Sequence, residues 1–153
     1  MAVSNVSTVD SEVWQLITTT TITPSTASYN YTSISGYKTI LIVGKNIVKA
    51  AANYNIVQFN GDTSAGAYAM NAQSGSGTQF YVAGNNAGPA AFGFIVYDVN
   101  KAVPHRVGVG YSTNAGSENQ YYTDPIAITS ILVAVSDSGT FTSGTIYVYG
   151  IAS

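Results

Sequence analysis

Short apolar segments with a two-residue alternation recur along the chain, separated by turn-forming residues. In 90–100 (AAFGFIVYDVN), Phe92, Phe94 and Val96 fall on one face and other apolar residues on the opposite face. Clusters of Gly, Asn, Ser and Pro interrupt such segments, and no segment has a sustained helical apolar period. The pattern therefore predicts an all-β protein.

The predicted strands set the expected architecture. The alternating or β-branched segments are 13–23, 37–44, 51–60, 78–84, 90–100, 105–112, 126–136 and 144–152. About eight strands of this length predict an antiparallel two-sheet β-sandwich, jelly-roll-like, with a closed barrel as the alternative.

The chain divides into an N-terminal arm and one domain. Residues 1–12 show no strong period, so we expect an arm that orders on a partner, or else a frayed end. This segment lacks the basic start and apolar run of a secretory signal. Residues 13–153 are expected to form a single β-sandwich domain, because the Gly/Ser-rich link 72–77 is too short to separate two domains.

Charge is scarce in this sequence and narrows the choice of partners. Asp, Glu, Lys and Arg make up 8% of residues, against about 25% in typical soluble domains. The net charge is −2, and no basic cluster is present that would neutralise phosphates. We therefore expect neither nucleic acid nor a membrane as a partner. A weakly charged surface rich in Tyr has little protection against association, so we infer that neighbouring subunits cover much of it.

The search for catalytic, cofactor and metal motifs is mostly negative. His105 is the single histidine, and no Ser or Asp is placed beside it by a recognisable relay motif. Paired carboxylates are not indicated, because Glu12 lies in the arm and Glu118 in an Asn/Gly-rich loop. We expect no enzyme activity, no cofactor and no metal, since the carboxylates that could bind calcium are scattered: Asp10, Asp62, Asp98, Asp124 and Asp137.

The stretch QFNGDTSAGAY contains a predicted turn. Asn60 and Gly61 tolerate the positive φ angles of tight turns, and the Asp62 side chain can accept main-chain N–H groups. The stretch lacks the ligand spacing of a helical calcium loop. A turn at the end of a strand is therefore the physical interpretation.

The same stretch resembles a motif of small β-sandwich domains in structural proteins of tailed bacteriophages. The family motif often reads F-N-G-D-T-G-x-N-Y. The matching positions are Phe59, Asn60, Gly61, Asp62, Thr63 and Tyr68. Ala67 stands where the family usually has Asn, and Tyr68 lies one place further along.

The C-terminal segment is similar to the ending of the same family. ITSILVAVSDSGTFTSGTIYVYGIAS matches I-T-S-I followed by F-x-S-G-[ST] and a final Y-G. The matching positions are Ile128, Thr129, Ser130, Ile131, Phe141, Ser143, Gly144, Thr145, Tyr149 and Gly150. With the early strand YKTILIVG, the resemblance covers about Tyr37 to Ser153.

The resemblance implies a virion protein assembled in the cytoplasm of a bacterial host. Capsid decoration, head-fibre and tail-fibre proteins are all compatible, commonly as homotrimers. The expected partners are further copies of the chain and the major capsid protein or other virion proteins. The motif residues themselves are expected to be structural, with Gly144 and Gly150 relieving crowding at the two ends of the last strand.

Two other classes of protein stay open. A carbohydrate-binding module on the same sandwich would bind host-surface glycans through the loop 112–124. The candidate glycan contacts are Trp14, Tyr121 and Tyr122, although such aromatics more often lie in a core or a subunit interface. A hydrolase would depend on His105 or Glu118.

Overall fold

The structure is a computed structural model that describes residues 13–70, 77–112 and 119–153. The expected arm at 1–12 and Glu118 lie outside the described residues, as does the rest of 113–118 in the loop 112–124.

The described residues form eleven strands and no helix, and so contain no helix that could span a membrane. The strands are β1 (Gln15–Thr21), β2 (Ser28–Tyr31), β3 (Tyr37–Lys49), β4 (Asn53–Phe59), β5 (Tyr68–Met70), β6 (Phe80–Asn86), β7 (Ala90–Tyr97), β8 (His105–Ser112), β9 (Asn119–Tyr122), β10 (Ile131–Val135) and β11 (Phe141–Ala152).

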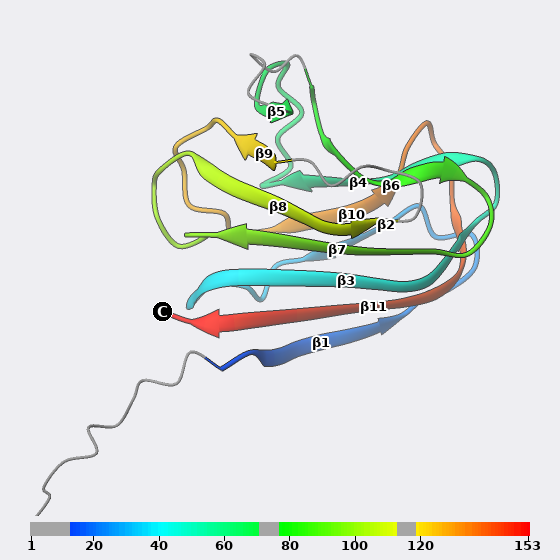
Figure 1. Cartoon of the computed structure of the whole chain (residues 1–153), viewed down its shortest axis with the longest axis horizontal. Helices are drawn as coiled ribbons and strands as arrows, with labels where there is room; N and C mark the ends of the chain where they lie inside the picture. Colours follow the sequence, from blue (N-terminus) through cyan, green and yellow to red (C-terminus); the bar gives the residue numbers. More distant parts are fainter. Residues whose placement is uncertain (1–12, 71–76, 113–118) are drawn as a thin grey trace, which may run out of the picture.

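These strands build two antiparallel sheets that pack face to face (Figure 1). The large sheet has the order β1-β11-β3-β7-β8-β9-β5, and the small sheet has the order β2-β10-β4-β6. The chain crosses between the sheets at every connection except those from β7 to β8 and from β8 to β9. The first and last strands pair with each other. This is jelly-roll connectivity, with β8, β9 and β5 extending the large sheet beyond β7.

The expected two-sheet β-sandwich is confirmed, but the strand count of about eight is too low. Three short strands, β2, β5 and β9, were missed because segments of three or four residues show no measurable alternation. β3 also continues past the expected end at Gly44 to Lys49. An irregularity in its pairing with β7 falls between Gly44 and Ile47, where Asn46 has a φ of 52°. The expected end of this strand is therefore a β-bulge within a longer strand.

The core lies between the inner faces of the two sheets and is rich in aromatic rings. Phe59 is at its centre, with ring centroids of Phe80, Phe94 and Tyr122 at 5.7, 6.0 and 5.2 Å. Such tilted and edge-on contacts add stability beyond that of burial alone. These contacts join β4 and β6 of the small sheet to β7 and β9 of the large sheet.

Gly144 is required inside β11. Its φ is +129°, and a Cβ atom there would lie 2.8 Å from the main-chain oxygen of Asn46 and 2.9 Å from Cα of Ile47. The position is within the strand, at a pairing irregularity with β3, and not at the strand's start as expected.

We predict that Gly144→Ala lowers the free energy of unfolding by about 2–4 kcal/mol, because main-chain strain and a main-chain clash combine. Denaturant unfolding measures this change. Gly88→Ala is the control: Gly88 has open space around its Cα, so the change should stay within about 0.5 kcal/mol. Equal effects of the two substitutions would contradict the assignment.

Candidate functional site

The predicted turn after β4 is present with the expected geometry. Asn60 and Gly61 have φ angles of 53° and 68°, as a type I′ turn requires. The N–H of Asp62 donates to the oxygen of Phe59 at 2.8 Å, closing the turn. The N–H of Ser64 donates to Oδ1 of Asp62 at 2.7 Å, so the Asp62 carboxylate accepts a main-chain N–H as expected.

The Asn60 side chain connects the two motifs that carry the family resemblance. Its Oδ1 accepts the N–H groups of Thr129 at 2.7 Å and Ser130 at 3.2 Å, and the Thr129 hydroxyl at 3.1 Å. Its Nδ2 donates to the oxygen of Ala127 at 3.0 Å. The carboxamide therefore positions the segment that leads into β10.

Two buried tyrosines hold the other side of the turn. The Tyr68 hydroxyl accepts the N–H of Phe59 at 2.8 Å and donates to the main-chain oxygen of Asp62 at 2.9 Å. The Tyr122 hydroxyl donates to Oδ2 of Asp62 at 2.9 Å. We call Asn60, Asp62, Tyr68 and Tyr122 the turn cluster.

The electrostatics of the turn cluster favour an ionised Asp62. Partial desolvation raises the pKa of Asp62, but hydrogen bonds from Ser64 and Tyr122 outweigh it and hold the pKa below its ordinary value. Burial raises the pKa of Tyr68 to about 12. Burial and the neighbouring Asp62 carboxylate also raise the pKa of Tyr122. Both phenols thus remain neutral donors at physiological pH.

The other motif residues lie either in packed parts of the fold or on its surface. Phe141 is fully buried in the core. A Cβ atom at Gly150 would overlap the ring of Tyr37 and lie 2.9 Å from Ile17, so the expected crowding is present there. Thr63 and Ser143 are exposed, and Tyr149 is partly exposed on β11.

The structure corrects one candidate glycan contact and leaves another untested. Tyr122 is fully buried and bonded to Asp62, so it is wrong as a surface contact for a sugar. Tyr121 belongs to β9, but its side chain lies outside the described part of the structure. Trp14 is exposed just before β1 and stays a candidate.

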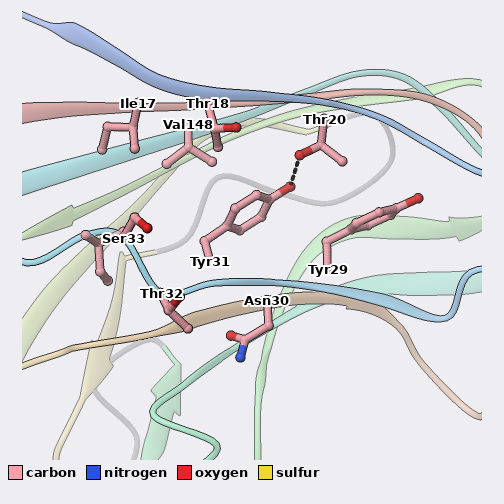
Figure 2. Close-up of a pocket in the computed structure, with 10 residues that line it drawn as sticks. Ile17, Thr18, Thr20, Tyr29, Asn30, Tyr31, Thr32, Ser33 and Val148 are labelled. Carbon is pink, nitrogen blue, oxygen red and sulfur yellow. Dashed lines mark hydrogen bonds between the residues drawn. The ribbon is translucent and has the colours of Figure 1, made fainter.

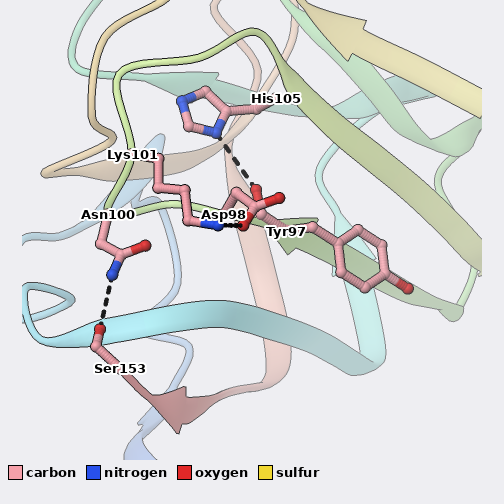
Figure 3. Close-up of polar contacts among 6 residues, drawn as sticks. All are labelled: Tyr97, Asp98, Asn100, Lys101, His105 and Ser153. Carbon is pink, nitrogen blue, oxygen red and sulfur yellow. Dashed lines mark hydrogen bonds and ion pairs between the residues drawn. The ribbon is translucent and has the colours of Figure 1, made fainter.

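His105 is buried at the start of β8 and bonds to main-chain atoms. Its Nδ1 faces the oxygen of Tyr97 at 3.3 Å (Figure 3), and its Nε2 faces the oxygen of Ile126 at 2.7 Å. Both ring nitrogens are thereby directed at carbonyl groups and not at a nucleophile. The nearby ion pair between Lys101 and Asp98 is exposed and local. This geometry indicates that His105 joins the β7–β8 connection to the segment before β10.

No group of three or more metal-ligating side chains occurs in the part of the chain that the structure describes. The Asp62 carboxylate of the turn cluster and the Asp98 carboxylate of the β7–β8 connection each have a protein hydrogen-bond partner.

The outward surface of the large sheet is rich in apolar and aromatic side chains. We call this surface the outer face. Strand pairing places these residues on it: Leu16, Leu41, Val43, Ile95, Tyr97, Tyr147, Tyr149 and Ile151. Tyr97 is 45% exposed and Leu16 55% exposed. A shallow hollow of about 530 Å³ lies on the same face, lined by Val43, Lys45, Gly93, Tyr147 and Tyr149 among others. One face therefore carries both projecting rings and a depression.

The protein is therefore a jelly-roll β-sandwich in which the residues of the turn cluster maintain the fold. Comparison with protein-family models, with curated protein sequences and with solved structures found no match.

Sequence reasoning missed the outer face as a unit. Its residues come from β1, β3, β7 and β11, which are adjacent in space but far apart in the chain. The available signal was that 37–44, 90–100 and 144–152 carry apolar residues on both alternating faces, although one face of each strand would suffice for the core.

We predict that Asn60→Ala lowers the free energy of unfolding by about 2–4 kcal/mol, because the N–H groups of Thr129 and Ser130 lose their acceptor. Thermal or denaturant unfolding measures the loss. Thr63→Ala, in the same motif but exposed, should change stability by less than about 0.5 kcal/mol. A stable Asn60→Ala protein would show that the carboxamide does not hold the turn cluster together.

We predict that the destabilisation caused by Tyr122→Phe depends on pH. The folded-state pKa of Asp62 is depressed, so its stabilising effect is present above the ordinary pKa of 3.8 and is lost as the pH falls through the folded value. The stability difference between wild type and Tyr122→Phe should therefore be largest near neutral pH and shrink in acid.

Tyr68→Phe is the matched control for this titration. The Tyr68 hydroxyl bonds to main-chain groups, so the cost of Tyr68→Phe should vary much less with pH. Unfolding free energies measured across the acid range test both variants. Parallel curves for Tyr122→Phe and wild type would contradict the role of the Tyr122–Asp62 hydrogen bond.

Proposed function

We propose that this protein is a structural subunit of a bacteriophage virion, most specifically a capsid decoration protein that binds the particle surface as a homotrimer. The resemblance of the two motifs supports this proposal, and so does their contact through Asn60. Residues separated by about half the chain act together to maintain one jelly roll. The motif residues maintain the fold and leave the other surfaces of the domain for assembly, which suits a structural subunit.

The observation that carries the proposal is the outer face. Isolated soluble domains usually expose polar side chains on the solvent side of an antiparallel sheet. Here Leu41, Val43 and Ile95 occupy that side together with tyrosines. Contiguous exposed apolar surface marks an interaction site. The outer face is thus the proposed contact between sister subunits.

A further copy of the chain is the partner that the outer face fits best. Homo-oligomer interfaces are richer in apolar and aromatic residues and poorer in charge than the rest of a surface. The outer face follows this composition: Val43, Tyr147 and Tyr149 line its hollow, and Lys45 is the one charged residue among the described residues that line it. Several copies on one oligomer would also multiply weak attachments to the capsid.

The alternative function is a tail-fibre or receptor-binding tip, or a carbohydrate-binding module that recognises host glycans. The exposed Trp14 is the described candidate residue that favours it. An enzyme of the hydrolase class would need a general base. His105 does not offer one in this geometry, because both of its ring nitrogens face main-chain oxygens. We therefore propose no catalytic role for this residue.

We predict that the wild-type protein has a solution mass of three times the 15.9 kDa chain, and that Val43→Glu shifts it to the monomer. A carboxylate at position 43 would be desolvated when a neighbouring subunit covers the outer face, and Lys45 is the one cation among the described residues that line the adjacent hollow. Light scattering coupled to size-exclusion chromatography measures the mass, and circular dichroism checks the fold.

Ser28→Glu is the matched control, because it adds the same charge to an exposed position of β2 on the small sheet. This variant should keep the wild-type mass. A wild-type protein that stays monomeric at high concentration, or an unchanged mass for Val43→Glu, would overturn the proposed interface.

A further inference from the structure

A groove opens at one side of the sandwich, where the edge strand of the large sheet faces the edge strand of the small sheet. We call it the β1–β2 groove. It has a volume of about 420 Å³, and its lining includes Ile17, Thr18, Thr20, Tyr29 and Tyr31. Figure 2 shows the Tyr29 and Tyr31 rings projecting from β2 toward β1. The size is that of a small-molecule site.

The two tyrosine hydroxyls of the groove keep hydrogen-bonding capacity. Tyr31 donates to Oγ1 of Thr20 at 3.2 Å across the groove. The Tyr29 hydroxyl accepts the N–H of Thr23 at 2.7 Å, which leaves its own proton for a further acceptor. The Thr20 hydroxyl likewise retains its proton. Hydroxyl groups that can still form hydrogen bonds therefore lie beside aromatic rings.

Successive side chains of a strand point to opposite sides, so only every second residue of the threonine run 18–21 faces the groove. Thr18 and Thr20 line the groove, whereas Thr19 and Thr21 do not. Thr32 and Ser33 add hydroxyl groups from the opposite strand end. Hydroxyls both donate and accept, as the hydroxyl groups of a sugar do.

The lining contains no Asp, Glu, Lys, Arg or His side chain. A charged ligand would lose its hydration without gaining a counter-charge. The partly exposed Tyr29 ring and Ile17 side chain suit the C–H surface of a sugar ring. From this combination we propose that the β1–β2 groove is a binding site for a short neutral saccharide.

A peptide fits these observations less well. A peptide that adds to a sheet edge is bound mainly through main-chain hydrogen bonds along the strand. The groove instead lies between two sheets and presents side-chain hydroxyls and rings. None of the described residues that line the groove belongs to loop 112–124. Saccharide binding in the groove goes beyond the decoration function and does not require it.

The experiment titrates the isotope-labelled wild-type chain with a panel of neutral di- and trisaccharides, lactose, cellotriose, maltotriose and chitobiose, and follows amide shifts by NMR. At least one saccharide should shift the amides of Thr18, Thr20, Tyr29 and Tyr31 in a saturable manner. Thr20→Val, which keeps the shape but removes the hydroxyl, should weaken that binding about tenfold.

Thr21→Val is the matched control on the same strand and should leave the affinity unchanged. Val43→Glu should also bind normally, so a failure of the proposed assembly is distinguishable from a failure of this site. The proposal is overturned if no saccharide of the panel binds at millimolar concentration, if the shifts map away from the groove, or if a strand-forming peptide shifts these amides and the saccharides do not.

Discussion

The hydrogen bonds of the Asn60 carboxamide are the interaction on which the arrangement of this sandwich most depends. They connect the turn after β4 to the segment before β10, two strands that pair in the small sheet. Because β10 lies between β2 and β4, its entry point sets the register of that sheet. Tyr68 and Tyr122 hold the turn from the core side, so the cluster also joins the small sheet to β5 and β9 of the large sheet.

Much of the fold was predictable, for reasons that also explain the errors. Long strands such as β7 show their alternation, and Asn60-Gly61 indicates a turn, because both signals are local. The contact between Asn60 and Thr129 spans 69 positions and has no local signal. Tyr122 was taken as a surface candidate because a tyrosine in an Asn/Gly-rich neighbourhood resembles a loop residue. Its burial became visible only with the pairing of β8, β9 and β5.

The surfaces of the molecule divide into different chemical types. The outer face has apolar and aromatic groups around a shallow hollow, which suits burial against another protein surface. The β1–β2 groove has uncharged hydroxyls around two rings, which suits a small polar ligand. Both follow from one property of the sequence, namely that Tyr and Thr provide the surface polarity that charged residues usually provide. A domain of this composition is suited to a crowded assembly more than to a free existence.

The most direct test of the central claim is electron microscopy of phage particles purified from the culture that produces this protein. The account predicts density for clustered copies of this jelly roll on the particle, with the outer face of each copy covered by a neighbour. Particles that lack the protein altogether, or that carry it as separated single copies with the outer face open to solvent, would contradict the account.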